Sequence, residues 1–178
     1  MIVYTVGHGT LPEADFIELV RNAGVDGIVD VRSYPGSRRN PQYGRAPLEQ
    51  WLPGAGVAYT WDPRLGGRRR PVATSLNTAL RHEAFQGYAD HMATHEFQDA
   101  LAELEGRARE LSTAIMCAEA VWWRCHRRLI SDALVARGWR AEHLGIGEGR
   151  AVHELPPFAI VEPEGLVRYP PQQASLLP

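Results

Sequence analysis

Short apolar runs alternate with amphipathic stretches along the first part of the chain. Residues 2–6 and 27–31 form apolar, β-branched runs that predict buried strands. Between them, apolar residues recur at helical spacing, and Thr10 followed by Glu13 predicts a helix that Thr10 caps and that Gly24 ends. A strand, a helix and a strand within about thirty residues predict a βαβ unit whose two strands are parallel neighbours.

The rest of the chain continues the same alternation. Its pattern predicts a helix at 47–52, a strand at 57–60, a helical region at 76–111 that breaks at His95-Glu96, a strand at 113–117, a helix at 126–137 and a last strand at 139–144. Together these elements predict an α/β fold, with a mostly parallel sheet of four or five strands and helices on both faces.

Proline and glycine change the character of the C-terminal part. We expect residues 1–155 to form a single α/β domain, with irregular chain from Gly145 onward, where the sequence is rich in Gly and Pro. Residues 156–178 are predicted to be a C-terminal tail that packs on the domain or trails from it, with the last ten residues disordered.

Composition narrows the chemistry. The chain has 178 residues, a formal net charge of −2 and 19 basic residues, all of them arginine. Without lysine, neither a Schiff-base lysine nor a P-loop lysine can be the catalytic device. Two cysteines in a chain of this size do not suggest a disulfide scaffold, so we expect a reducing cytoplasm. No signal sequence is recognisable and no apolar run approaches the ~20 residues that span a bilayer, so no membrane partner is expected.

Two polar loops follow predicted strands and are rich in arginine. Residues 32–45 and 62–71 are also rich in turn formers. A basic rim is predicted from Arg38, Arg39, Arg68, Arg69 and Arg70, with Tyr34, Tyr43 and Trp61 interleaved. That composition is typical of a phosphate or nucleic-acid surface with stacking groups. The alternative is a set of solvated arginines on mobile loops.

Residues 115–128 hold both cysteines of the chain. Cys117 ends a predicted strand, and Cys125 lies at the start of a predicted helix, whose N-terminal partial positive charge favours a thiolate. One hypothesis is that either cysteine is a nucleophile or a ligand, and the alternative is that Cys117 is a small buried core residue. A disulfide redox switch is a further alternative, and it requires Cα atoms within about 7 Å.

The candidate site residues all lie near the carboxyl ends of predicted strands, where open α/β sheets bind ligands. We therefore expect one pocket at this edge of the sheet. The candidate catalytic residues are Cys125, Cys117, Glu119, His8 and Asp30. The candidate substrate-binding residues are Arg32, Ser33, Tyr34, Arg38, Tyr43, Arg124, His126 and Arg127.

Several of these residues have two possible roles. Glu119 is either a general acid or base, or the partner of Arg32 or Arg127 in a bidentate ion pair. Asp30 and Arg32 share one face of an extended segment, where they form either an acid with an anion clamp or a buried ion pair. His8 is the better partner for a thiol, because adjacent helical residues such as Cys125 and His126 point about 100° apart.

Other familiar sites do not fit the sequence. The cysteine phosphatase loop requires arginine six residues after its cysteine, and that position after Cys117 is Trp123, with Arg124 one residue late. No CxxC spacing is present and no metal ligands are assigned, and a bound metal or haem stays an open alternative. No GxGxxG or Walker sequence is present, and the cofactor is left unassigned.

Three segments together resemble a known family. They are Thr5-Val6-Gly7-His8-Gly9-Thr10, then Asp30-Val31-Arg32-Ser33-Tyr34-Pro35, and then Met116-Cys117-Ala118-Glu119 with Cys125-His126-Arg127. This pattern is similar to the domain of unknown function 488 family, over roughly the whole chain as far as Pro156-Pro157-Phe158. The resemblance implies a small cytosolic prokaryotic α/β protein and brings no established reaction.

Two functional hypotheses follow. The first is a cysteine-dependent enzyme that acts on an anionic nucleotide or nucleic-acid-derived substrate, by acyl, glycosyl or phosphoryl transfer. The second is a non-catalytic module that binds nucleic acid, a metal or haem through the same residues. The oligomeric state is not predicted.

Overall fold

The computed structural model describes residues 1–36, 38–146 and 149–171. The helices within these residues are α1 (Glu13–Asn22), α2 (Arg45–Gly54), α3 (Glu83–Met92), α4 (His95–Glu110) and α5 (Arg127–Ala136). The strands are β1 (Ile2–Gly7), β2 (Gly27–Asp30), β3 (Ala58–Trp61), β4 (Thr113–Cys117), β5 (Arg140–Ile146), β6 (Gly149–Val152), β7 (Ile160–Val161) and β8 (Val167–Arg168). Short 3₁₀ turns lie at Pro41–Tyr43, Pro63–Leu65, Trp122–Arg124 and Pro163–Gly165.

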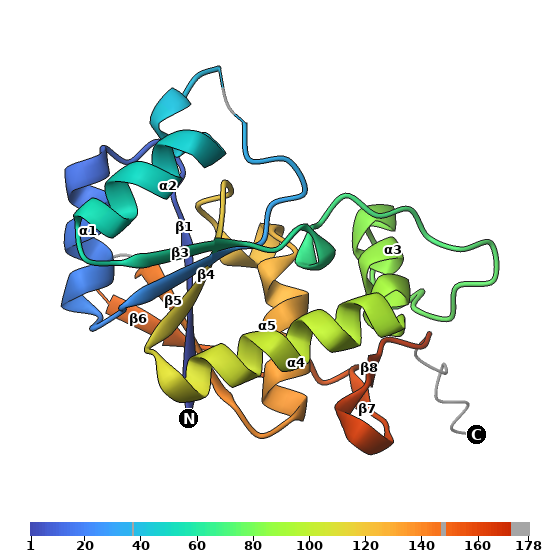
Figure 1. The fold of residues 1–178 in the computed structure, drawn as a ribbon. Coiled ribbons are helices and arrows are strands. Elements are labelled where there is room, and N and C mark those ends of the chain that lie inside the picture. The colour runs from blue at the N-terminus through green and yellow to red at the C-terminus, as the bar shows by residue number, and fades with distance from the viewer. Residues whose placement is uncertain (37, 147–148, 172–178) are drawn as a thin grey trace, which may run out of the picture.

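In the described residues a six-stranded sheet has the order β3-β2-β4-β1-β5-β6. The pairs among β3, β2, β4, β1 and β5 are all parallel, and β6 is antiparallel to β5 at one edge. Figure 1 shows α1 and α2 on one side of this sheet and α4 and α5 on the other. The predicted α/β class, with helices on both faces, is therefore confirmed, and the extra strand is the antiparallel edge.

Two hydrophobic cores fill the spaces between the layers. On one face, Phe16 and Val20 of α1 and Leu48 and Leu52 of α2 pack against the strands. On the other face, side chains of α3, α4 and α5 pack against Val3, Val29 and Ile115. Because alternate residues of a strand point to opposite faces, Ile28 and Val29 belong to different cores.

The predicted pairing of the first two strands is wrong in one respect. β1 and β2 are parallel, but β4 lies between them and pairs with both. Gly7 is in register with Cys117, and Asp30 with Met116. The thiol-bearing strand therefore ends between the strand that leads to His8 and the strand that ends at Asp30, which brings distant residues to one edge.

Several predicted boundaries also change. Thr10 is exposed and does not cap a helix: Leu11 N–H donates to the His8 carbonyl in a turn, and α1 begins at Glu13. Residues 76–82 are irregular rather than helical. The helix break lies before His95, where the Thr94 hydroxyl accepts from Phe97 N–H and so caps α4.

The segment after Gly145 is more ordered than predicted. β5 runs to Ile146, β6 extends the sheet, and β7 pairs with β8 in a separate hairpin. Tyr169 is fully buried, and its hydroxyl donates to Asp132 of α5 at 2.6 Å. The described part of the tail thus packs on the domain. The predicted disorder of the last ten residues falls largely on 172–178, outside the described residues, and the boundary at 155 stays a prediction.

None of the helices in the described residues is both long enough and apolar enough to cross a bilayer.

Replacing Tyr169 by Phe tests the packing of the tail. Asp132 is fully buried and accepts from His153 at 2.7 Å and from Tyr169. Loss of the phenol hydroxyl leaves one buried carboxylate oxygen without its donor, so we expect Tyr169→Phe to lower the free energy of unfolding by about 1–3 kcal/mol. Urea denaturation measures this change, and exposed Tyr34→Phe is the matched control, expected within about 0.5 kcal/mol of wild type. Equal stability of both variants would show that the contact does not hold the tail.

Candidate functional site

A cavity of about 810 Å³ opens at the carboxyl ends of β1, β2 and β4. The predicted site residues that line it are His8, Arg32, Ser33, Tyr34, Cys117, Glu119, Arg124, Cys125 and His126. Asp30, Arg38, Tyr43 and Arg127 are not part of its wall. Most of the candidate site residues, which come from separate segments, therefore lie together at one edge of the sheet.

The two thiols and one imidazole form the floor of the cavity. His126 Nδ1 lies 3.6 Å from Cys125 Sγ and 4.0 Å from Cys117 Sγ, and all three atoms lie within 4.8 Å of one another. His126 Nε2 lies 2.9 Å from the Val31 carbonyl, which can only accept. Nε2 therefore carries a proton, and Nδ1, the ring nitrogen that faces both sulfurs, is positioned to accept a proton from a thiol.

Local structure places each member of this group. Cys117 is the last residue of β4, and Cys125 follows the 3₁₀ turn at 122–124, just before α5. Gly67 packs on the face of the His126 ring, where an added Cβ would lie 2.4 Å from Nδ1. Because Gly67 has no side chain, the imidazole has room to take this orientation. Although Cys125 and His126 are adjacent, their side chains meet, because His126 precedes the helix rather than lying within it.

Arg127 lies behind the thiols and is only 1% exposed. Its Nε lies 3.5 Å from Cys125 Sγ, and its terminal nitrogens donate to the Glu119 carbonyl and, at 3.5 Å, to Thr5 Oγ1. Gly7 makes this approach possible, since a Cβ there would lie 2.7 Å from the guanidinium. In the described residues Arg127 forms no salt bridge with a carboxylate. The nearest group that can carry its counter-charge is the Cys125 sulfur.

The two thiols differ in their protonation. A hydrogen bond from Cys117 lowers the pKa of Cys125 well below its ordinary value, and His126 and Arg127 lower it further. The same hydrogen bond and burial raise the pKa of Cys117. Of the two thiols, Cys125 is therefore the one whose neighbours favour the thiolate form, and it is also the one that accepts from Arg127 Nε.

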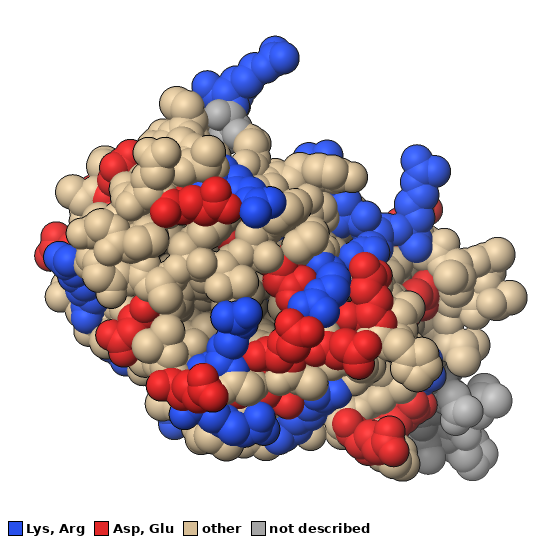
Figure 2. Space-filling view, in the orientation of Figure 1, with Lys and Arg blue, Asp and Glu red and all other residues tan. Residues whose placement is uncertain are grey.

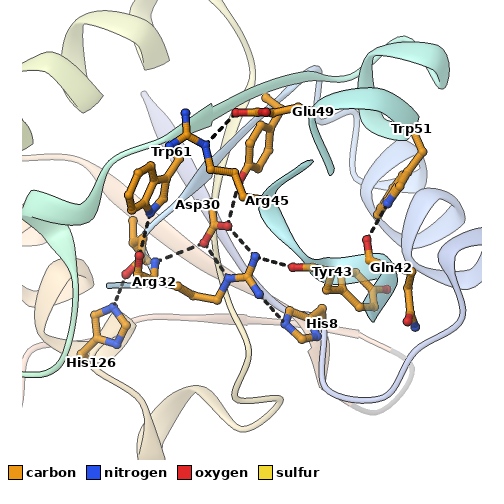
Figure 3. Close-up of polar contacts among 12 residues, drawn as sticks. His8, Asp30, Arg32, Gln42, Tyr43, Arg45, Glu49, Trp51, Trp61 and His126 are labelled. Carbon is orange, nitrogen blue, oxygen red and sulfur yellow. Dashed lines mark hydrogen bonds and ion pairs between the residues drawn. The ribbon is translucent and has the colours of Figure 1, made fainter. Parts of the chain in front are cut away.

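A second cluster supports the cavity wall around His8. Figure 3 shows Arg32 between Asp30 and His8, with the Tyr43 carbonyl accepting from the same guanidinium. Arg32 donates to His8 Nε2 at 3.2 Å, and His8 Nδ1 donates to the Gly9 carbonyl at 3.0 Å. Both ring nitrogens of His8 are thus occupied. The geometry does not offer the Nε2 lone pair as a base for a thiol, the role predicted for His8.

Asp30 and Tyr43 act through their neighbours. Asp30 is fully buried and its Oδ2 pairs with Arg32 at 2.6 Å, while the Tyr59 hydroxyl donates to the same oxygen at 2.9 Å. Tyr43 is fully buried and stacks on His8 with centroids 4.0 Å apart. Of the two roles considered for Asp30 and Arg32, the buried ion pair matches this arrangement.

The rim of the cavity is polar and open. Tyr34 is 73% exposed, and Arg124, which also lines the cavity, is exposed. Glu119 is also exposed; its carboxylate accepts from Val121 N–H at 3.3 Å and forms no ion pair with Arg32 or Arg127. Arg38 is exposed on its loop, outside the cavity wall.

Some lining residues were not singled out in the sequence. These are Gly9, Gly36, Asn40, Gly67, His82, Ala84, Phe85, Ala118 and Trp123. His82 fell inside a predicted helix, although it is the exposed residue that caps α3 through its own ring nitrogen. Its position at the end of a polar loop was the signal that could have identified it.

A buried polar chain behind Arg127 was also missed. Thr5 lies 2.7 Å from His143 Nδ1, His143 Nε2 lies 2.9 Å from His153 Nδ1, and His153 Nε2 lies 2.7 Å from Asp132. Periodicity assigned His143 to a strand interior, with no sign of a partner. The chain connects the site to the segment that Tyr169 anchors.

The donor set that could hold a metal in the described residues is Cys117, Cys125 and His126.

Acid should destabilise the protein through His8. Burial, followed by the charge of Arg32, lowers the pKa of His8 from 6.5 to about 4. The unfolded chain then binds the proton first, so the contribution is fully present above about pH 6.5 and is lost as the pH falls toward about 4. We expect a loss of about 2 kcal/mol between pH 7 and pH 4.5, measured by urea denaturation. His8→Gln should flatten this slope and exposed His82→Gln should not; equal slopes in all three proteins would contradict the assignment.

Comparison with known proteins gives a family and no assigned activity. No curated protein and no solved structure matches the chain. The model of the domain of unknown function DUF488 matches residues 13–134, which include Asp30, Arg32 and the whole Cys117–Arg127 segment. The matched part covers more than half of the 178 residues, so the chain belongs to the DUF488 family.

Proposed function

We propose that this protein is a cysteine-dependent enzyme that acts on an anionic, nucleotide or nucleic-acid-derived substrate. The observation that carries the proposal is the position of Cys125 Sγ. It lies at the floor of the cavity, 3.6 Å from an imidazole nitrogen and 3.5 Å from a buried guanidinium. A nucleophilic thiol needs a partner to take its proton and a positive group to stabilise the anion, and both are in place.

The charge of the cavity favours an anionic substrate. Its wall contains Arg68 and Arg124, together with Arg32, whose charge is balanced by Asp30, and Glu119 is the single acidic residue among those that line it. The chain as a whole has a formal net charge of −2, and Figure 2 shows acidic and basic side chains interspersed over one face. Positive charge therefore gathers at the cavity rather than over the whole molecule, which concentrates a negative ligand there.

Exposed aromatic side chains favour a ligand with a planar ring. Tyr34 is 73% exposed and Trp123 is 49% exposed, and both line the cavity. The Arg68 guanidinium lies 5.6 Å from the centre of the Tyr34 ring. A nucleobase stacks on such rings, while adjacent arginines bind its phosphate.

The reaction is nucleophilic transfer. The Cys125 sulfur attacks the electrophilic carbon or phosphorus of the substrate and forms a bond to it, and the leaving group departs with the bonding electron pair and takes up a proton. Water then cleaves the sulfur-bound group and restores the thiol. Glu119, exposed at the cavity wall, is the candidate general acid and base for these two proton transfers. We expect this chemistry in a reducing cytoplasm, where both thiols stay free.

Selective alkylation tests the nucleophile. We expect iodoacetamide at neutral pH to modify Cys125 at least tenfold faster than Cys117, because the thiolate is the reactive form. The folded, metal-free chain is alkylated and then digested, and mass spectrometry of the peptides measures both rates. A nucleoside monophosphate should slow the modification of Cys125, and Arg124→Gln should weaken this protection more than Arg38→Gln, its matched control outside the cavity wall.

The same reagents separate the enzyme from a binding module. Equal, slow alkylation of both cysteines would overturn the nucleophile. Oligonucleotide binding that falls steeply with salt and does not change in Cys125→Ser would favour a nucleic-acid-binding module instead.

A further inference from the structure

We propose that Cys117, Cys125 and His126 form a binding site for a thiophilic divalent metal ion, Zn²⁺ foremost, whose fourth coordination position opens into the cavity. The inference is independent of the proposed function. It rests on three ligand atoms, one at the end of β4 and two in the segment just before α5, that lie within 4.8 Å of one another.

The spacing of the ligand atoms is close to that of a tetrahedral site. Zinc–sulfur bonds of about 2.3 Å and zinc–nitrogen bonds of about 2.0–2.1 Å place neighbouring sulfur and nitrogen ligands roughly 3.6 Å apart. The distance from His126 Nδ1 is 3.6 Å to Cys125 Sγ and 4.0 Å to Cys117 Sγ. Both nitrogen-to-sulfur distances are therefore within a few tenths of an ångström of the spacing in a tetrahedral site.

The groups around the ligands already have the arrangement that metal sites use. Metal-bound histidines donate their second ring N–H to a carbonyl or carboxylate, and His126 Nε2 donates to Val31 at 2.9 Å. This bond fixes the tautomer that leaves Nδ1 free for a metal. Arg127 Nε contacts the Cys125 sulfur at 3.5 Å and supports its thiolate form.

Access and charge are also suitable. All three residues line the cavity, so an ion can enter and an exchangeable ligand can take the fourth position, as in sites with three protein ligands and one open position. Two thiolates neutralise Zn²⁺, which leaves the buried site with the single charge of Arg127. Two sulfur ligands disfavour Mg²⁺ and Ca²⁺, which prefer oxygen.

Metal binding and nucleophilic attack exclude each other at Cys125. The lone pair that binds the ion is the one that would attack a substrate, so the reactive thiolate belongs to the metal-free chain. Saturating Zn²⁺ is therefore expected to protect both cysteines from iodoacetamide.

Metal titration of the reduced, full-length chain tests the site. We expect one Zn²⁺ per chain in competition with a chromophoric chelator. Co²⁺ in its place should give sulfur-to-metal charge transfer and the intense visible bands of a tetrahedral ion. Cys117→Ser, Cys125→Ser and His126→Asn should each weaken Zn²⁺ binding at least tenfold. His95→Asn, at an exposed histidine outside the cavity wall, is the matched control and should bind as wild type does.

A second variant keeps all three ligands. Gly67→Ala places a methyl group against the His126 ring, so it should weaken Zn²⁺ binding while leaving both thiols titratable with a thiol reagent. Circular dichroism confirms that each variant is folded. Substoichiometric binding, an unchanged affinity in His126→Asn, or a Co²⁺ spectrum without sulfur ligation would overturn the site. Alkylation rates in the metal-free chain report the nucleophile separately, so either inference can fail without the other.

Discussion

The buried guanidinium of Arg127 is the charge around which this edge of the molecule is arranged. It lies among the ends of parallel strands, 1% exposed, and in the described residues its partners are carbonyls, a hydroxyl and a thiol rather than a carboxylate. An unpaired buried charge is costly, so the surroundings must supply negative charge or dipoles. The Glu119 carbonyl, the Thr5 hydroxyl and the Cys125 sulfur do so, and Gly7 gives the space.

From Arg127 a chain of hydrogen bonds runs through the interior. Arg127 donates to Thr5, Thr5 to His143, His143 to His153, and His153 to Asp132. This direction of donation satisfies every ring nitrogen with neutral histidines, and the pKa of His143 is lowered to about 3 by burial and by His153. The chain ends at a carboxylate that also accepts from Tyr169. One buried polar network therefore connects the thiol site with β5, α5 and the C-terminal segment.

The site itself divides into two parts with different physics. Around His8, the Asp30–Arg32 ion pair, a stacked tyrosine and the Gly9 carbonyl occupy both ring nitrogens and one ring face. Around Cys125, Nδ1 of His126 and the two sulfurs lie at the wall of the cavity, where a ligand can reach them. The residues around His8 form the wall beside the residues around Cys125. The His126 nitrogen and the two sulfurs at the cavity floor can therefore bind an electrophile or a metal ion.

The order of apolar and polar residues by itself determined the α/β class, the main strands and helices, and the edge at which the site would lie. These are local properties: periodicity follows backbone geometry, and the carboxyl ends of parallel strands share one edge. The order of the strands in the sheet was decided by the tertiary structure, because the insertion of β4 between β1 and β2 joins segments that are far apart in the sequence. So was the division of labour, in which Asp30 and Tyr43 support His8 while His126, adjacent to Cys125, turns its nitrogen toward two sulfurs. Some of the contacts that decide these roles join residues far apart in the sequence, such as His126 and Val31, and no local pattern predicts them.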